Sequence, residues 1–219
     1  MKDVIFFDLD GTLTKSEEGI IRCVQYALRE LGMPVPAKKD LFYFIGPPLV
    51  DSFLTLPGFT EAMALEATAC TGNATLQLAS LKMNCTQALR TYWRRLMRQV
   101  PACYGIGQTG SFCASHYRSF WPYALFSGNW RCFLRCSRRT KSAVIAEVLN
   151  RLGLQKTKER VLMVGDTAYD VEGARKIGID CVGVTYGYGK ETELAAAHPL
   201  GLAATVEALK DGLLTHAFG

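Results

Sequence analysis

The chain has 219 residues, a formal net charge of +5 and a hydrophobic content of 49%, which suits one domain or a core with a small cap. No apolar run is long enough to span a membrane, and the first residues form an apolar strand-like segment rather than a signal peptide. We therefore expect a cytoplasmic protein without a membrane partner, whose eight cysteines are free thiols.

The first predicted element is a strand over residues 4–8, an apolar and aromatic run of the kind that is buried on both faces. It runs into Asp8, Asp10, Gly11 and Thr12. Residues i and i+2 of a strand point to the same side, so Asp8 and Asp10 would emerge together where Gly11 lets the chain turn. Two adjacent carboxylates repel each other and are costly to bury, and a divalent cation removes this cost. An acidic strand end that faces water is the alternative, and it suits an isolated Asp-x-Asp better than this longer motif.

This segment resembles the first motif of the haloacid dehalogenase (HAD) superfamily of phosphohydrolases, closest to the phosphoglycolate phosphatase-like branch. The resemblance implies that Asp8 is the nucleophile that forms an aspartyl-phosphate, and that Asp10 is the general acid and then the general base. It places Mg²⁺ between Asp8, the backbone carbonyl of Asp10 and a later aspartate. It also implies that Gly11 and Thr12 bind the phosphate.

A cap is predicted next, over residues 15–80. Residues 16–31 show the apolar spacing of an amphipathic helix, with Ser16 as its N-cap. In the family a helical cap follows the first motif directly, and a Gly-Pro-Pro-Leu segment like residues 46–49 lies near the active site. The chain departs from the family at Lys15, where relatives usually carry an acid.

Residues 71–137, called the basic window below, lose the family pattern. Between Ala67 and Ala146 there are 11 lysines and arginines and no acidic residue, whereas the rest of the chain holds 14 basic and all 20 acidic residues. Six of the eight cysteines and all three tryptophans lie in the same stretch. The second core strand of the family, which ends in a phosphate-binding Ser or Thr, is not readable there. The candidates by residue type alone are Thr86, Thr109 and Ser111.

Three interpretations of the basic window compete. It is a basic insert that binds nucleic acid through arginines, Tyr92 and Trp93, or a zinc module, or a frame-shifted stretch of an ordinary gene of this family. The cysteines lack the C-x₂-C pairs of a zinc module. Regrouped codons force Glu from Met83-Asn84, Leu from Asn84-Cys85 and, in the opposite shift, Gly from Trp121-Pro122, each where the family pattern has it. We favour the frame-shift hypothesis and do not expect nucleic acid as a partner.

The family pattern resumes at residue 138, and residues 140–152 predict a helix that ends at Gly153. Lys141 stands in its first turn. A single lysine is more often solvated. The resemblance instead implies that Lys141 steadies the nucleophile and the charge of the phosphoryl group.

Residues 160–165 predict a second buried strand, which runs into Asp166 and Asp170. In the family's fourth motif, Asp166 corresponds to a Mg²⁺ ligand, and Asp170 to a residue that orients the metal's surroundings. A helix over 171–177, a strand over 181–184, a loop over 186–189 and a closing helix up to residue 214 follow. Strand, helix and strand at this spacing predict a parallel sheet, and both acidic motifs then lie at the carboxyl ends of strands.

The predicted fold is therefore α/β: a Rossmann-like parallel-sheet core from residues 1–14 and 138–219, with an inserted helical cap. The predicted function is Mg²⁺-dependent hydrolysis of a small phosphorylated metabolite, of the phosphoglycolate or nucleoside monophosphate type. Two alternatives stay open, namely a phosphomutase or phosphotransferase with the same intermediate, and a non-catalytic protein that binds nucleic acid through the basic window.

Overall fold

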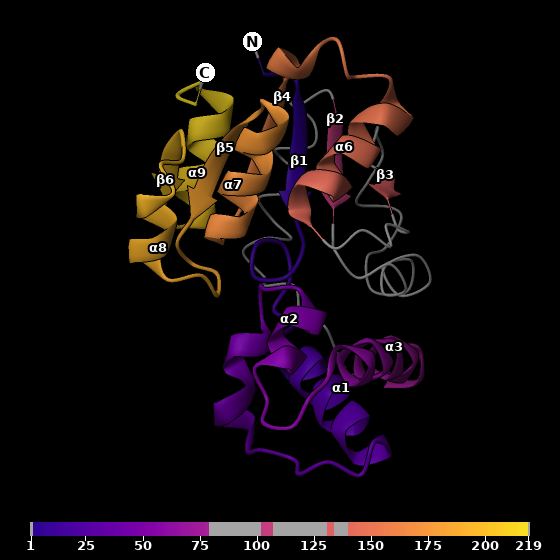
Figure 1. Ribbon diagram of the computed structural model, residues 1–219. Coiled ribbons are helices and arrows are strands. Elements are labelled where there is room, and N and C mark those ends of the chain that lie inside the picture. The colour runs from indigo at the N-terminus through magenta and orange to yellow at the C-terminus, as the bar shows by residue number, and fades with distance from the viewer. Residues whose placement is uncertain (1, 79–101, 107–130, 134–139, 219) are drawn as a thin grey trace.

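Six parallel strands form a sheet in the computed structural model, which describes residues 2–78, 102–106, 131–133 and 140–218 (Figure 1). The strands are β1 (Val4–Asp8), β2 (Ala102–Ile106), β3 (Arg131–Phe133), β4 (Val161–Gly165), β5 (Asp180–Val184) and β6 (Gly201–Ala203). Their order is β3-β2-β1-β4-β5-β6, so the direction of winding reverses between β1 and β4. Ligands of open α/β sheets bind outside the carboxyl ends of the strands at such a point.

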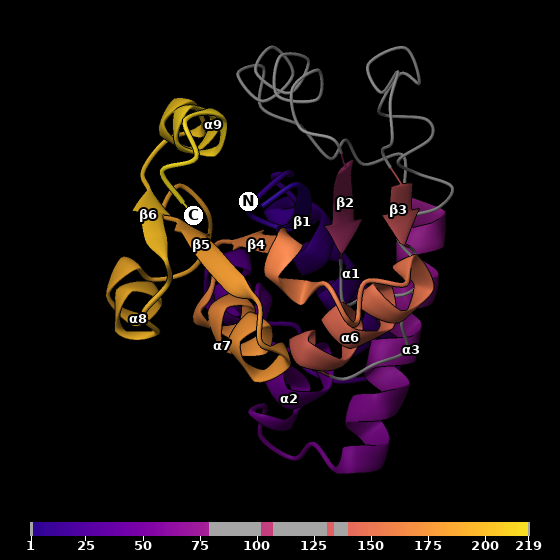
Figure 2. The same ribbon diagram turned by 90° about the horizontal axis from the view of Figure 1, so that it is seen from above.

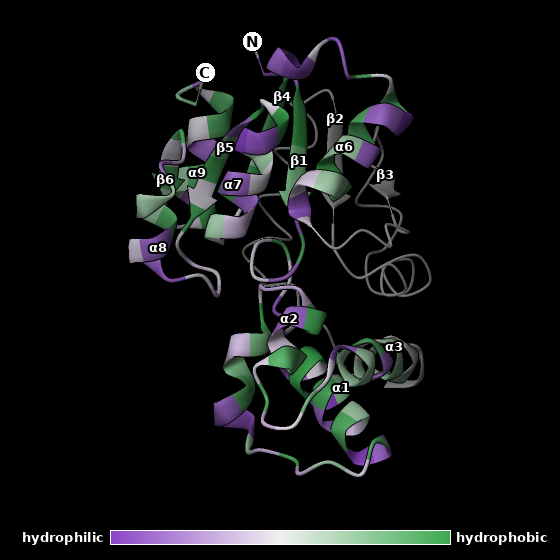
Figure 3. Ribbon diagram, viewed as in Figure 1, coloured by the Kyte–Doolittle hydropathy of each residue, from purple (hydrophilic) through white to green (hydrophobic). Residues whose placement is uncertain are grey.

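The central strands are buried on both faces because helices cover the sheet. Every residue of β1 and of β4 is buried, and β1 is hydrophobic up to its last residue, Asp8 (Figure 3). The helices α6 (Lys141–Leu152), α7 (Ala168–Ile177) and α8 (Glu191–Ala196) lie along one face, and α9 (Val206–Leu214) lies on the other (Figure 2). The apolar runs predicted as buried strands are confirmed.

The ends of α6 agree with the sequence-based prediction. The hydroxyl of Thr140 accepts a hydrogen bond from the backbone N–H of Ala143, and Gly153 closes the helix in the left-handed conformation. Both features are typical helix boundaries. The first side chain of α6, Lys141, is thereby held at the carboxyl end of β1.

A separate bundle of helices forms the cap below the core (Figure 1). It consists of α1 (Glu17–Glu30), a 3₁₀ helix η1 (Lys38–Phe44), α2 (Leu49–Leu54) and α3 (Glu61–Leu78). Its own apolar cluster includes Phe44 and Phe53, whose rings meet edge to face with centroids 4.9 Å apart. The cap therefore buries most of its apolar side chains against one another, with Tyr188 of the core packed against the same cluster.

Three details differ from the sequence-based expectations. The last segment is not one closing helix, because α8 and β6 precede α9. The second core strand, which the sequence did not reveal, is β2, paired in parallel with β1. Ser16 stands at the N-cap of α1, but its side chain makes no capping hydrogen bond. The candidates Thr86, Thr109 and Ser111, and the residues on which the frame hypothesis rests, lie outside the described residues.

The membrane expectation can be compared with the helices. Within the described ranges, no helix combines the length and the apolar character needed to cross a bilayer.

Two helical glycines allow a matched test of how closely α6 and α7 pack. A Cβ on Gly173 of α7 would lie 2.8 Å from the Cβ and Cγ atoms of Lys141, whereas a Cβ on Gly19 of α1 would meet nothing within 4 Å. We expect Gly173→Ala to destabilise the protein by about 1–3 kcal/mol, because α7 would be pushed off α6. We expect Gly19→Ala to stabilise it by about 0.5–1 kcal/mol through helix propensity. Chemical denaturation of both variants measures this, and changes of the same sign would contradict the close approach.

Candidate active site

The acidic motifs meet at the carboxyl ends of β1 and β4. Asp8 is the last residue of β1, and Asp166 directly follows Gly165 at the end of β4. These strands are hydrogen-bonded neighbours, with Phe7 opposite Val164. The two aspartates, which are far apart in the sequence, are therefore side by side at the point where the winding reverses.

Three carboxylates gather at this place. One oxygen each of Asp8, Asp166 and Asp170 lies within 4.8 Å of the others, and all three side chains are buried. Asp170 can come this close because residue 165 is glycine: a Cβ there would lie 2.3 Å from the carboxyl carbon of Asp170. An oxygen-only donor set of this kind suits a hard cation such as Mg²⁺.

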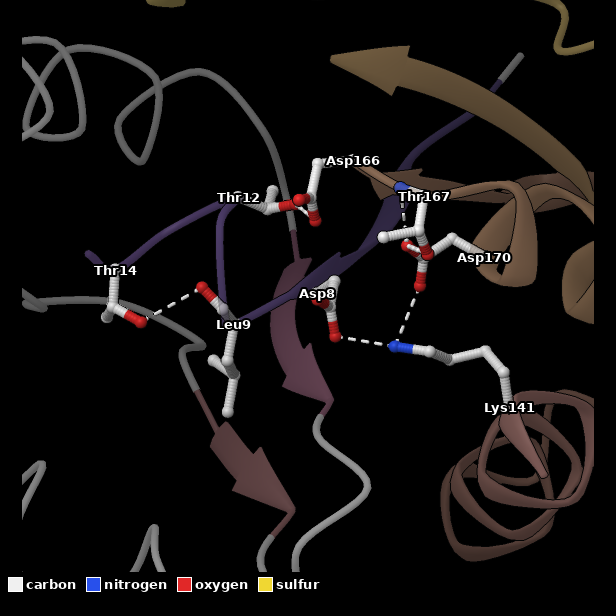
Figure 4. Close-up of polar contacts among 8 residues, drawn as sticks. All are labelled: Asp8, Leu9, Thr12, Thr14, Lys141, Asp166, Thr167 and Asp170. Atoms are coloured by element: carbon white, nitrogen blue, oxygen red, sulfur yellow. Dashed lines mark hydrogen bonds and ion pairs between the residues drawn. The ribbon is translucent and has the colours of Figure 1, made fainter. Parts of the chain in front are cut away.

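Lys141 lies between two of these carboxylates (Figure 4). Its Nζ atom is 2.5 Å from Oδ1 of Asp8 and 2.7 Å from Oδ1 of Asp170, and its side chain is only 7% exposed. The alternative of a solvated lysine is therefore wrong. The N-terminus of α6 thus places the buried ammonium group of Lys141 beside Asp8, the last residue of β1.

The charges in this cluster are strongly coupled. Burial raises the pKa of Asp8 well above its usual value, Lys141 opposes this rise, and the neighbouring Asp170 and Asp166 add to it. Burial and the nearby Asp170 raise the pKa of Asp166 to about 7. Burial disfavours the charged form of Lys141, but the two carboxylates outweigh burial and raise its pKa, so it remains a cation. One ammonium group against three carboxylates leaves negative charge that a divalent cation would neutralise.

Hydrogen bonds fix the orientation of the carboxylates opposite Lys141. Asp166 accepts from the hydroxyl of Thr12 at 3.1 Å and from the backbone N–H of Tyr188 at 2.7 Å. Asp170 accepts from the backbone N–H of Thr167 at 3.1 Å and from its hydroxyl at 2.7 Å, within the capping box of α7. These bonds hold the acids in place before any ligand binds.

The turn after β1 serves this arrangement. Gly11 has a φ of +89°, and a Cβ there would lie 2.2 Å from Oδ2 of Asp166, so a glycine is needed both for the turn and for the close approach. Thr12 is buried, and its hydroxyl donates a hydrogen bond to Asp166. The sequence-based prediction that Gly11 and Thr12 bind phosphate remains a prediction.

Asp10 stands apart from the three gathered carboxylates. It is half-buried and forms a bridge with Thr14 within the turn. Burial raises its pKa, a shift that suits a group that must carry a proton at neutral pH. Its predicted roles as acid, base and carbonyl ligand stay predictions.

The sequence placed the loop of residues 186–189 over this edge of the sheet, but it gave no role to the two tyrosines of the loop. The backbone N–H of Tyr188 donates to Asp166, and the hydroxyl of Tyr186 donates a hydrogen bond to the carbonyl oxygen of Thr12 at 3.4 Å. The available signal was a Tyr-Gly-Tyr-Gly run directly after a strand, which places small residues beside aromatic ones at the binding edge.

Comparisons with known proteins agree with this geometry. The family model described as haloacid dehalogenase-like hydrolase matches residues 5–82, and a second, described as HAD-hydrolase-like, matches residues 139–211. A 5'-nucleotidase of Pseudomonas aeruginosa is 35% identical over an alignment that covers 97% of this chain and 96% of the relative. The chain belongs to the haloacid dehalogenase-like hydrolases. The predicted fold class and the prediction of a phosphatase are thereby confirmed.

Two further similarities cover nearly the whole chain. The tyrosine-protein kinase PtkA of Mycobacterium tuberculosis is 28% identical over 96% of this chain and 72% of its own length. The crystal structure of a predicted phosphatase from Clostridium acetobutylicum superposes with a TM-score of 0.86 at 27% identity, over 98% of this chain and 99% of that chain. The HAD-like fold therefore has a close counterpart among solved structures.

The buried ion pairs make Lys141 the residue whose loss should cost most. We expect Lys141→Met to destabilise the protein by about 3–5 kcal/mol at pH 8, because Asp8 and Asp170 would stay buried without their cation. Lys190→Met is a matched control, since Lys190 pairs with Glu193 at the surface with 76% of its side chain exposed. We expect it to change stability by less than about 0.5 kcal/mol. Equal unfolding midpoints of the two variants in denaturant would contradict this account of the cluster.

Proposed function

We propose that the chain hydrolyses a small phosphate monoester with the help of Mg²⁺ and through an aspartyl-phosphate on Asp8. The observation that carries this proposal is the buried cluster at the point where the winding of the sheet reverses. In it, Lys141 holds Asp8 while two further carboxylates face the same space. The family assignment supports phosphate chemistry at this place.

The residues present fit a magnesium ion. Asp8 and Asp166 would each give an oxygen, together with the carbonyl oxygen of Asp10, while Asp170 would stay bonded to Thr167 and Lys141. The ion would neutralise phosphoryl oxygens and the excess charge of the carboxylates. The buried carboxylates and the bonds that orient them support this assignment.

The proposed reaction assigns one step to each of these side chains. A carboxylate oxygen of Asp8 attacks phosphorus, and the bond from phosphorus to the ester oxygen breaks. Asp10 gives its proton to the departing oxygen, which leaves as an alcohol. Asp10 then takes a proton from a water molecule that attacks the same phosphorus, and the bond to Asp8 breaks, which releases inorganic phosphate. Lys141 favours the anionic form of Asp8 and so opposes the rise of its pKa that burial causes.

The substrate class is proposed from the relatives. The relative named 5'-nucleotidase supports a nucleoside monophosphate, and phosphoglycolate remains the second candidate. The relative named tyrosine-protein kinase favours one alternative, in which the phosphoryl group passes to an acceptor other than water. Release of inorganic phosphate without any acceptor would argue for hydrolysis.

Loss of the nucleophile is the direct test. We expect Asp8→Asn to lower phosphate release from nucleoside monophosphates by about 10³-fold or more, because an amide cannot form the aspartyl-phosphate. Asp211→Asn, on the exposed end of α9, is the matched control and should keep full activity. A spectrophotometric phosphate assay with both variants, each checked for folding by circular dichroism, decides this. Mg²⁺-dependent turnover by Asp8→Asn would remove Asp8 from its role.

For the basic window we propose that residues 71–137 are a frame-shifted stretch of cap and core. The two family models match residues 5–82 and 139–211, on either side of most of it. We expect a frame-restored chain to release phosphate far faster than the chain as it stands, because the restored segment would supply a Ser or Thr for the phosphate. The coding DNA from codon 66 to codon 146 and rates of both chains are the measurements. Equal rates would refute the functional claim, and RNA or DNA binding that survives Asp8→Asn would favour the basic insert.

A further inference from the structure

The loop of residues 185–189, between β5 and α8, lies directly on Asp166. A Cβ on Gly187 would be 2.3 Å from the Cβ of Asp166, and a Cβ on Gly189 would be 2.0 Å from its carbonyl oxygen. Neither position has room for a side chain, so the loop backbone packs against this aspartate without intervening atoms. A displacement of the loop would therefore change the packing around Asp166.

Tyr188, in the same loop, also reaches the cap. Its backbone N–H donates to Oδ2 of Asp166 at 2.7 Å, and its hydroxyl accepts from the backbone N–H of Glu17 at 3.2 Å. Its ring packs against the apolar cluster of the cap, although the residue belongs to the core. One residue thus contacts the carboxylate cluster with its main chain and the cap with its side chain.

The bond to Glu17 satisfies a specific need of helix α1. The first N–H groups of a helix have no partner within the helix and are usually satisfied by an N-cap side chain. Ser16 does not do this. The hydroxyl of Tyr188 supplies the acceptor instead, from the other part of the molecule. Helix α1 starts three residues after Thr14, so its N-terminus marks where the cap leaves the core.

We propose that Tyr188 is a positioning residue that couples the placement of the cap to the orientation of Asp166. While α1 is capped by Tyr188, the ring and the hydroxyl keep the peptide N–H directed at Oδ2 of Asp166. If the cap moves away, both side-chain contacts are lost and the loop is free to release that oxygen. Because coupling between two sites is reciprocal, a cation bound at Asp166 favours the capped position of α1. The inference rests on the proposed metal site.

The test uses Tyr188→Phe, which removes the hydroxyl and keeps the ring and the backbone. Tyr169→Phe is the matched control, because Tyr169 lies on α7 with 47% of its surface exposed. Each protein is titrated with Mg²⁺ alone, and the melting temperature of the protein is measured at each Mg²⁺ concentration. Hydrogen exchange of the peptide that contains Glu17 is followed by mass spectrometry with and without Mg²⁺.

In the wild type and in Tyr169→Phe we expect Mg²⁺ to slow exchange at the start of α1. In Tyr188→Phe we expect exchange there to be faster and no longer to respond to Mg²⁺, and the Mg²⁺ concentration at half-saturation to rise about twofold to tenfold, the effect of one hydrogen bond. A purely structural tyrosine would speed exchange equally with and without Mg²⁺ and leave Mg²⁺ affinity unchanged, which would overturn the coupling. A wild type that does not respond to Mg²⁺ at all would instead refute the metal site, and the coupling with it.

Discussion

The ion pairs of Lys141 with Asp8 and Asp170 are the interaction on which the rest of the core depends. Three buried carboxylates within a few ångströms would repel one another, and burial penalises each charge separately. The ammonium group of Lys141 offsets part of this cost. Two features of the fold place this group beside the carboxylates. Helix α6 begins at Lys141, and Gly173 lets α7 approach that side chain. The excess charge that remains is what makes the site suitable for a divalent cation.

The same place joins the two parts of the molecule. The turn after β1 leads into α1, and the loop after β5 contacts both the turn and the first residue of that helix. Gly11, Gly187 and Gly189 allow these backbones to crowd around Asp166. Cap and carboxylates therefore share a small set of contacts, and a substrate held between cap and core would act on both at once.

A wide family can share this chemistry because few residues carry it. The relatives carry names as different as 5'-nucleotidase and tyrosine-protein kinase. In the proposed mechanism, a carboxylate, a lysine and an oxygen-lined metal site would accept a phosphoryl group from many molecules, since they would recognise the group and not its carrier. Under this proposal, the choice of substrate would depend on the cap and on the phosphate-binding residue of the second motif. The predicted cap and the second motif both overlap the basic window, so the origin of this window is the central question for this chain.

The sequence by itself determined the parts whose physics is local. Apolar runs that end in Asp8 and Asp166 indicated buried strands with acids at their ends, and the boundaries of α6 followed from Thr140 and Gly153. Only the tertiary structure decided that Lys141 is buried between two acids, that the hydroxyl of Thr12 serves Asp166, and that Tyr188 caps α1 in place of Ser16. These contacts join residues up to 171 positions apart, and no periodicity or propensity encodes which distant partner a side chain meets. Strand β2 belongs to the same class, because its pairing with β1, and not its sequence pattern, defines it.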